Sequence, residues 1–158
     1  MLKDRVATKD NLIKRGVTCI AADCPMCKAT PENPDHVFAR CSTTRVVSAH
    51  LFSWLDWWPP SATTVHDMWM AINSVTDGLR KEVGKTIMAA FFWTIWSQRN
   101  CKVFNGMIKK ERVILSDIQF LAYDWIRCRS KFGKLLSWES WLCNPADAVS
   151  SCIALAPR

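Results

Sequence analysis

Four residues near the amino terminus constrain this chain more than any other feature: Cys24, Cys27, His36 and Cys41, spaced as C-x2-C-x8-H-x4-C. A C-x2-C step bends the backbone into a tight knuckle that aims two thiolates at one point. A histidine and a third cysteine complete a tetrahedron of three sulfur atoms and one nitrogen, which Zn²⁺ prefers. Because the protein fills all four positions, we predict one structural zinc ion with no position for an activated water.

The spacing of the second ligand pair also predicts local structure. Five residues of a regular helix turn the chain through about 500°, so His36 and Cys41 would not share a helix face. We therefore expect one of them in a turn at a helix end. The alternative interpretation is a chance cluster that includes a core histidine, and Cys19 is the one plausible substitute ligand.

The remaining four cysteines match no metal-site spacing, and we interpret them as buried structural residues: Cys101, Cys128, Cys143 and Cys152. The charged amino terminus, Met1–Arg5, shows no export signal, so thiols are expected to stay reduced. The longest apolar run, residues 87–96, is about half of what a bilayer span needs. We expect a soluble, intracellular protein without a membrane partner, in either nucleus or cytoplasm.

Length and composition indicate a globular chain. It has 158 residues, of which 49% are hydrophobic and 22% charged, which excludes a disordered or low-complexity protein. The net charge of +7, from 21 basic and 14 acidic side chains, permits an acidic partner such as RNA or DNA, although solubility alone accounts for it equally well.

Basic residues near the predicted zinc ion are the candidates for nucleic-acid contact. Three thiolates, a neutral imidazole and Zn²⁺ sum to a charge of −1, so any affinity must come from surrounding side chains. The candidates are Lys9, Lys14 and Arg15 in the amino-terminal segment and Lys28 and Arg40 beside the zinc. A second patch is predicted at Lys109, Lys110 and Arg112.

The pattern along the chain predicts a mainly α protein, with a small irregular zinc-knuckle module followed by a Trp-rich helical bundle. We divide it into residues 1–42 (basic segment and zinc module), 43–142 (helical region) and 143–158 (loose tail). Prolines at positions 25, 31 and 34 oppose regular structure in the zinc module.

Apolar residues at three- and four-residue steps predict the helices, with Val46, Trp69, Val113 and Cys128 among the positions expected to face the core. Thr8 is the expected N-cap of a short first helix, and Pro59-Pro60 is expected to end a helix that starts at Thr43. The middle of residues 81–104 is apolar nearly all round, which predicts the central helix, and Asn105-Gly106 is its stop signal. Further helices are predicted over residues 61–73, 109–131 (with Gly133 past its end) and 137–142, the last capped by Ser137.

The nine tryptophans have two interpretations. They could form a platform on which bases stack, but most fall at helical core spacing, which favours the core. Exposed candidates are Trp57 or Trp58, Trp138 and Trp141.

Several linked motifs resemble a known family. The stretch Ala7–Gly16 (ATKDNLIKRG), the knuckle Cys24–Cys27 (CPMC), and Glu32 with Asp35–Phe38 (DHVF) and Cys41 follow one another in order. They closely resemble the reverse-transcriptase zinc-binding domain of plant LINE-type (non-LTR) retrotransposons. That family has the pattern P-T-[RK]-x-N-L-x-[KR]-R-G, then C-P-x-C and E-x-x-x-H-[LV]-F-x-x-C.

The resemblance continues downstream. Phe92–Asn100 (FWTIWSQRN) with Val103-Phe104 is similar to the family's W-x-I-W-x-x-R-N-x-x-[VI]-F helix, and residues 124–145 are similar to the usual end of these reading frames. Arg99 and Asn100 match this motif. For them we favour a structural role, an arginine favoured by the helix dipole and an asparagine capping the helix end.

The resemblance implies the zinc ligands Cys24, Cys27, His36 and Cys41, and a role in engaging the element's RNA or target DNA. Ala7 stands where the family usually has proline, and the chain has no Asp-Asp pair of the kind a polymerase needs for two metal ions. Neither the endonuclease nor the ribonuclease H carboxylates are found in the sequence. We therefore expect a non-catalytic carboxy-terminal fragment of a retrotransposon reverse transcriptase, with no small-molecule substrate.

Two function classes follow from these observations. The first is a zinc-dependent module that binds RNA or DNA. The alternative is a structural or protein-interaction domain that packs on the polymerase domain of the parent element and binds no nucleic acid itself. An enzyme that uses the zinc ion is disfavoured because the predicted site is closed.

Overall fold

The computed structural model describes residues 5–19, 21–57 and 62–156. Lys3, Trp58, Pro59-Pro60 and Ser61, which entered the sequence predictions, lie outside these ranges. The described part is helical, and its only β-type pairing is an isolated bridge between Asp23 and Pro31. The mainly α class is therefore confirmed, with the elements α2 (Lys9–Lys14), η1 (His36–Arg40), α3 (Ser42–Trp54), α4 (Val65–Asn73), α5 (Gly78–Asn105), α6 (Glu111–Arg129), η2 (Gly133–Leu135), α7 (Trp138–Cys143) and α8 (Pro145–Leu155).

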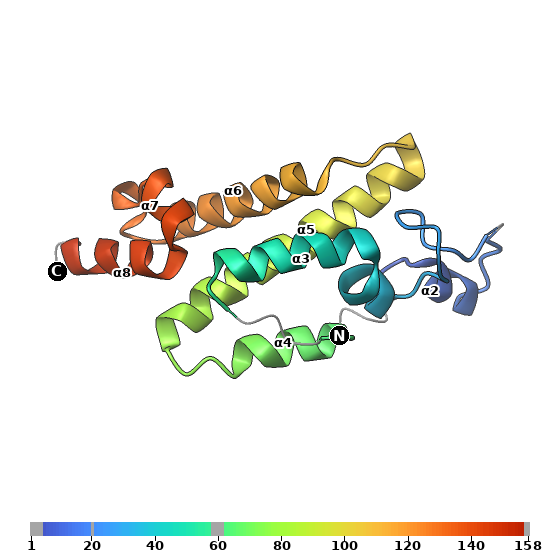
Figure 1. Ribbon diagram of the computed structural model, residues 1–158, viewed down its shortest axis with the longest axis horizontal. Coiled ribbons are helices and arrows are strands. Elements are labelled where there is room, and N and C mark those ends of the chain that lie inside the picture. Colours follow the sequence, from blue (N-terminus) through green and yellow to red (C-terminus); the bar gives the residue numbers. More distant parts are fainter. Residues whose placement is uncertain (1–4, 20, 58–61, 157–158) are drawn as a thin grey trace.

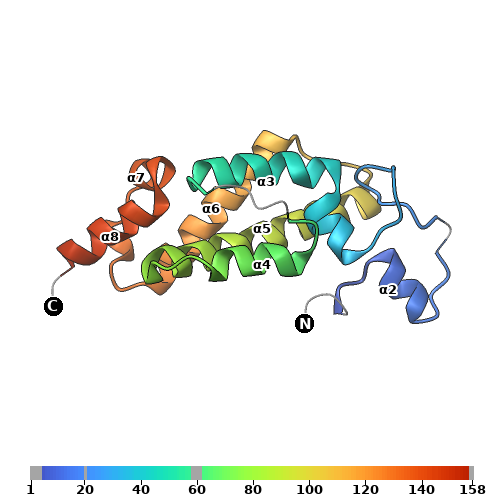
Figure 2. The same ribbon diagram turned by 60° about the horizontal axis from the view of Figure 1, so that its bottom comes forward.

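The molecule is built around α5, which extends through most of its length (Figure 1). Helix α6 returns antiparallel along α5, while α4, α8 and η1 also pack against α5. Helix α3 packs on α6 and η1. The segment with α2 and the Cys/His loop lies at one end of the molecule, and α7 and α8 lie at the other (Figures 1 and 2).

The central position of α5 follows from its sequence. Its buried side chains include Val83, Ile87, Ala90, Phe91 and Ile95, the five apolar positions at helical spacing. Asp77 caps its start by accepting a hydrogen bond from the Arg80 N–H at 2.8 Å. Gly106 ends the helix in the left-handed conformation, with φ at 71°. The predicted central helix and its stop signal are confirmed.

The helices α3 and α4 differ from prediction at their ends and on their faces. Helix α3 ends at Trp54, where Asp56 adopts a left-handed φ of 52° and the Trp57 N–H donates to the Phe52 carbonyl at 3.0 Å. Helix α4 starts after Thr64, whose hydroxyl forms a capping box with Asp67. Two expected core residues are exposed, Val46 at 44% and Trp69 at 44%.

The expectation for the scattered cysteines is wrong for two of the four. Cys152 is buried and Cys101 partly buried, but Cys128 and Cys143 are exposed. Cys128 was expected on the inward face of α6, where only Ile114, Ile118 and Ala122 are buried. The predicted inward residue Val113 is also exposed, because the buried stripe of α6 is narrower than the apolar pattern.

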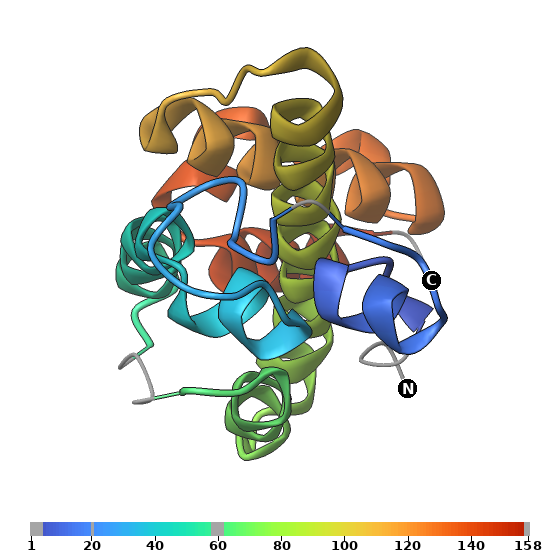
Figure 3. The same cartoon turned by 90° about the vertical axis from the view of Figure 1, so that its right-hand side faces the viewer.

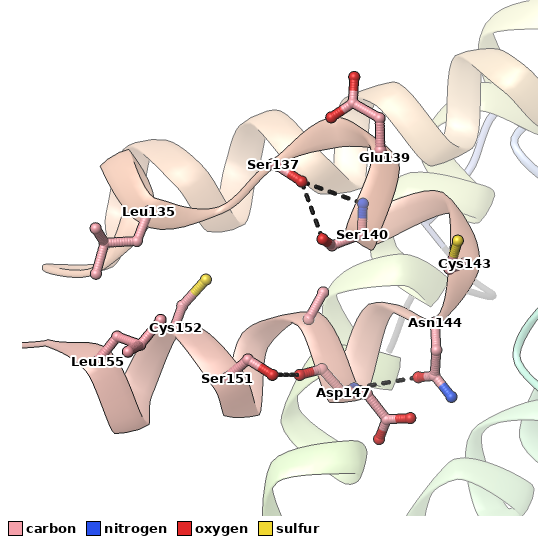
Figure 4. A pocket seen from close by; sticks show the side chains of 11 residues that line it. Leu135, Ser137, Glu139, Ser140, Cys143, Asn144, Asp147, Ser151, Cys152 and Leu155 are labelled. Atoms are coloured by element: carbon pink, nitrogen blue, oxygen red, sulfur yellow. Dashed lines mark hydrogen bonds between the residues drawn. The ribbon is translucent and has the colours of Figure 1, made fainter.

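The loose tail predicted from Cys143 onward is wrong for residues 145–155, which form α8 (Figure 4). The Asn144 side chain accepts hydrogen bonds from the Ala146 and Asp147 N–H groups, and Pro145 occupies the first turn. Val149 and Cys152 bury their side chains. Asn-Pro-x-Asp is thus a helix start signal that the sequence interpretation missed. The Ser137 cap of α7 is confirmed by its hydrogen bond from the Ser140 N–H.

The tryptophans mostly pack on the core, as expected, but not in the predicted distribution. Trp141 was an exposed candidate and is fully buried, with its ring 5.6 Å from that of Trp54. Trp138 is half-buried, and the half-buried Trp57 lies against Gly84 of α5. Among the tryptophans in the described ranges, Trp69 and Trp93 are exposed, the latter at 64%.

Gly133, predicted as a helix stop, serves a packing role. A Cβ at this position would lie 1.8 Å from the backbone carbonyl oxygen of Arg127. We expect Gly133→Ala to destabilise the protein by about 1–3 kcal/mol, because backbone must shift to relieve the clash. Gly78→Ala, where a Cβ meets nothing within 4 Å, is the control and should leave stability unchanged or slightly higher. Equal urea midpoints for both variants and the wild type would contradict this prediction.

Candidate metal centre

The four predicted ligands converge at one point. The ligand atoms of Cys24, Cys27, His36 and Cys41 all lie within 4.8 Å of one another. The Sγ atoms of Cys24 and Cys41 are 4.0 Å apart, and Cys27 Sγ is 3.2 Å from His36 Nε2. Cys24 and Cys41 are fully buried. Cys19, the substitute candidate, does not belong to the cluster.

These distances fit a tetrahedral zinc ion. Zn–S bonds of about 2.3 Å place two thiolates of a tetrahedron roughly 3.8 Å apart, and a Zn–N bond of about 2.0 Å brings sulfur and nitrogen slightly closer. The observed separations of 4.0 and 3.2 Å bracket these values. Three thiolates and one imidazole form a closed set, so the site supports one structural zinc.

Backbone pairing shapes the first half of the site. The Cys24 N–H donates to the Thr30 carbonyl and the Glu32 N–H donates to the Ala22 carbonyl, each at 2.8 Å. The Lys28 N–H returns to the Cys24 carbonyl at 2.8 Å, and Lys28 adopts a left-handed φ of 58°. This turn directs Cys24 and Cys27 toward the same point, as the C-x2-C spacing predicts.

The second ligand pair is joined by a single wide turn. Residues His36–Arg40 form η1, a π-helix, and the Cys41 N–H donates to the His36 carbonyl at 2.7 Å. This i→i+5 bond brings residue 41 back over residue 36, which an α-helix would not do. Cys41 lies at the junction with α3, so the expectation of a ligand at a helix end is confirmed.

Two polar side chains that the sequence interpretation missed orient His36. Thr30 Oγ1 lies 2.9 Å from His36 Nδ1, which leaves Nε2 for the metal. Asn33 Oδ1 accepts the His36 backbone N–H at 2.8 Å and an Arg40 N–H at 3.2 Å. Each lies a few residues before the histidine, as outer ligands of a metal-binding histidine commonly do, but neither position is marked by residue type alone.

Proton binding distinguishes the two buried thiols. The Cys24–Cys41 hydrogen bond, together with burial, raises the pKa of Cys24 well above its usual range. The same hydrogen bond lowers the pKa of Cys41 to about 5, because the Cys24 S–H stabilises the Cys41 thiolate. At neutral pH the first negative charge therefore forms at Cys41, and a zinc ion must displace the proton of Cys24.

A buried ion pair connects the metal centre to α5. Arg99 donates from Nε and Nη2 to the two carboxylate oxygens of Glu32, at 2.6 and 2.8 Å. Side-chain exposure is 6% for Arg99 and 0% for Glu32. Glu32 Oε2 also accepts the Lys9 N–H at 2.9 Å and so caps α2. Glu32 thereby joins α2, the zinc loop and α5.

Three sequence predictions change because of this pair. Arg99 has a structural role, but not through the helix dipole, since α5 continues to Asn105. Asn100 does not cap the helix; its Oδ1 accepts an Arg99 N–H at 3.0 Å. Thr8 occupies the N-cap position of α2 without a side-chain cap bond, and within the described residues its hydroxyl has no hydrogen-bond partner.

The five basic candidates lie around the zinc loop in different environments. Lys28 and Arg40 are exposed and flank the ligands Cys27 and Cys41. The Lys9 ammonium donates to the Asp23 carbonyl at 2.7 Å, and Lys14 pairs with Asp10 at 2.8 Å. Arg15 is exposed at the end of α2. In the second patch, Lys110 and Arg112 are exposed and Lys109 pairs with Asp117 at 2.7 Å.

Comparison with known proteins bears on the amino-terminal part of the chain. Residues 1–47 match the model of a family described as zinc-binding in reverse transcriptase. The match ends within α3 and contains all four ligands, which supports a reverse transcriptase zinc-binding domain here, an accessory and not a catalytic domain. No curated protein and no solved structure matches the chain. No helix in the described ranges is long and apolar enough to cross a membrane.

Proposed function

We propose that this chain is a non-catalytic nucleic-acid-binding module whose binding surface is shaped by its zinc centre. Its partner is RNA or DNA, and its context is a fragment of a LINE-type retrotransposon reverse transcriptase of a plant. The family match over residues 1–47 supports the reverse transcriptase context. The resemblance of the downstream helix motif to plant LINE elements supports the finer assignment.

The observation that carries the proposal is the position of two exposed cations next to two ligands. Lys28 follows Cys27 directly, and Arg40 precedes Cys41 directly. A bound metal would therefore hold the backbone that carries both side chains. Arg40 is further positioned by Asn33, which also binds the His36 backbone. Cations on a rigid loop are suited to phosphate contact, since little loop ordering is needed on binding.

The test is the salt dependence of nucleic-acid binding by a double variant that removes two positive charges, Lys28→Gln with Arg40→Gln. Each lost phosphate contact reduces the slope of log K against log salt by about 0.7–0.9. We expect the double variant to lower the slope by roughly 1.5. The measurement is fluorescence anisotropy with RNA and DNA oligonucleotides between about 50 and 200 mM salt.

The matched control is Lys131→Gln with Lys134→Gln, which removes the same charge from exposed positions beside η2, away from the zinc loop. This control should keep the wild-type slope. If both double variants change the salt slope equally, the effect comes from net charge alone, and this result would contradict the proposal. Wild-type affinity that does not respond to salt would contradict any phosphate contact.

A second candidate function is supported by a separate observation. Large apolar side chains are exposed around the α5–α6 turn and on α6, among them Phe104 at 78%, Met107 at 66% and Phe120 at 60%. This surface suits packing against a polymerase domain of the parent element. A monomer that binds no dye for exposed apolar surface would count against this alternative.

A further inference from the structure

A groove runs along one face of α5, at the edge of the core. Phe92, Trp93 and Trp96 line it on α5, Trp69 lines it on α4, and Trp125 lines it on α6. Its volume is about 980 Å³. In Figure 3, where α5 runs from bottom to top, α4 lies below α5 and the end of α6 lies to the right of α5. We refer to this feature as the Trp93 groove.

Unlike the side chains of an ordinary core, part of the aromatic lining of the Trp93 groove is exposed to solvent. Its walls carry four indole rings, and two of them are open to solvent, Trp93 at 64% and Trp69 at 44%. Flat aromatic faces of this kind are the surfaces on which unpaired bases stack, and every base has a suitable face. A base-paired duplex offers no such face except at its ends.

The charges at the groove have one sign. Arg5 is the charged side chain in its lining, and no carboxylate lines it among the described residues. The Arg129 guanidinium lies over the Trp125 ring at 5.5 Å from its centroid. Arg99 lies over Trp96, but Glu32 balances its charge. Aromatic faces bordered by Arg5 and Arg129 complement a chain of bases joined by phosphates.

The groove adjoins the zinc centre. Phe38, which lies between the ligands His36 and Cys41 in η1, also lines the groove. Its ring contacts Phe92 at 5.4 Å and is 6.3 Å from Trp96. Arg5 lies in the segment that leads into α2. The turn η1, which carries Arg40 next to the ligand Cys41, therefore also contributes a side chain to the groove.

From these observations we infer that the Trp93 groove binds single-stranded nucleic acid, with bases stacked on Trp93 and Trp69 and phosphates at Arg5 and Arg129. The inference rests on the proposed function and specifies its substrate class: unpaired strands. The zinc-loop cations contact phosphate in any nucleic acid, whereas the groove selects strands whose bases are free.

The test compares a 12-nucleotide dT strand, a rU strand of equal length and a DNA duplex, bound to the zinc-loaded full chain at about 50 mM salt. Trp93→Ala should weaken single-strand binding about tenfold and leave duplex binding unchanged. Trp93→Phe, which keeps an aromatic face, should restore most of the affinity. Phe104→Ala is the matched control, since Phe104 lies on the same helix, is 78% exposed and does not line the groove.

Four outcomes would overturn the inference. If Trp93→Ala binds single strands as the wild type does, while Lys28→Gln with Arg40→Gln is weakened, the groove is not the site and the proposed function survives. An equal loss with Phe104→Ala, or an equal loss for the duplex, would remove the selectivity that defines the groove. If the wild type is a dimer that Trp93→Ala dissociates, without an effect on nucleic acid, the groove is a protein interface.

Discussion

Removal of zinc is expected to unfold the loop over residues 17–42 and to detach it from the helices. In the described part of this loop, the structural elements are one isolated bridge and one π-turn. Apparent zinc binding in small metal-dependent modules contributes roughly 10–16 kcal/mol. Without the ion, the buried thiols and imidazole have no partner of comparable strength. The expected result is loss of amide exchange protection in residues 17–42 when a chelator is added, while α5 and α6 stay protected.

Variants of single ligands distinguish the loss of zinc from a general loss of stability. Elemental analysis should find one zinc per chain in the wild type, and His36→Ala and Cys41→Ser should each lose it together with the folded loop. Cys19→Ser is the matched control, because Cys19 is a nearby cysteine outside the cluster. Full zinc content in folded Cys41→Ser protein, or loss of zinc in Cys19→Ser, would contradict the ligand assignment.

Breaking the Glu32–Arg99 pair should cost about 3–5 kcal/mol of stability. Both side chains are more than nine-tenths buried, so removing either partner leaves an uncompensated charge away from water. We expect Arg99→Met to lower the urea midpoint of the zinc-bound protein strongly, because it leaves the Glu32 charge without its partner. Glu32→Gln should also lower the midpoint, because it leaves the Arg99 charge without its partner. Glu32→Gln should also weaken the start of α2, because Glu32 accepts the Lys9 N–H.

A double variant and an exposed pair complete this experiment. Glu32→Leu with Arg99→Met removes both charges, so it should be more stable than either single variant. Asp117→Asn, which breaks the exposed pair with Lys109, should change stability by less than about 1 kcal/mol. Arg99→Met with a stability within about 1 kcal/mol of the wild type would show that the pair contributes little.

The metal centre was predictable because metal coordination depends on residue type and short spacing. Cys24 and Cys27 lie within one turn, and thiolates and imidazole are the ligands that zinc takes. The turn between His36 and Cys41 was harder to predict. This turn is a π-helix whose Val37 and Phe38 are buried in the core, and the α-helical period of 3.6 residues does not describe it.

The sequence by itself determined the Cys/His cluster, most of the helices and the central position of α5, since each rests on local spacing or on a repeating apolar pattern. Only the tertiary structure decided the partner of Arg99, which is 67 positions away from Glu32. It also decided which tryptophans are exposed: Trp93 is 64% exposed, whereas Trp141, expected at the surface, is fully buried. Local patterns record what a segment prefers, whereas contacts between distant segments depend on how all of them pack together.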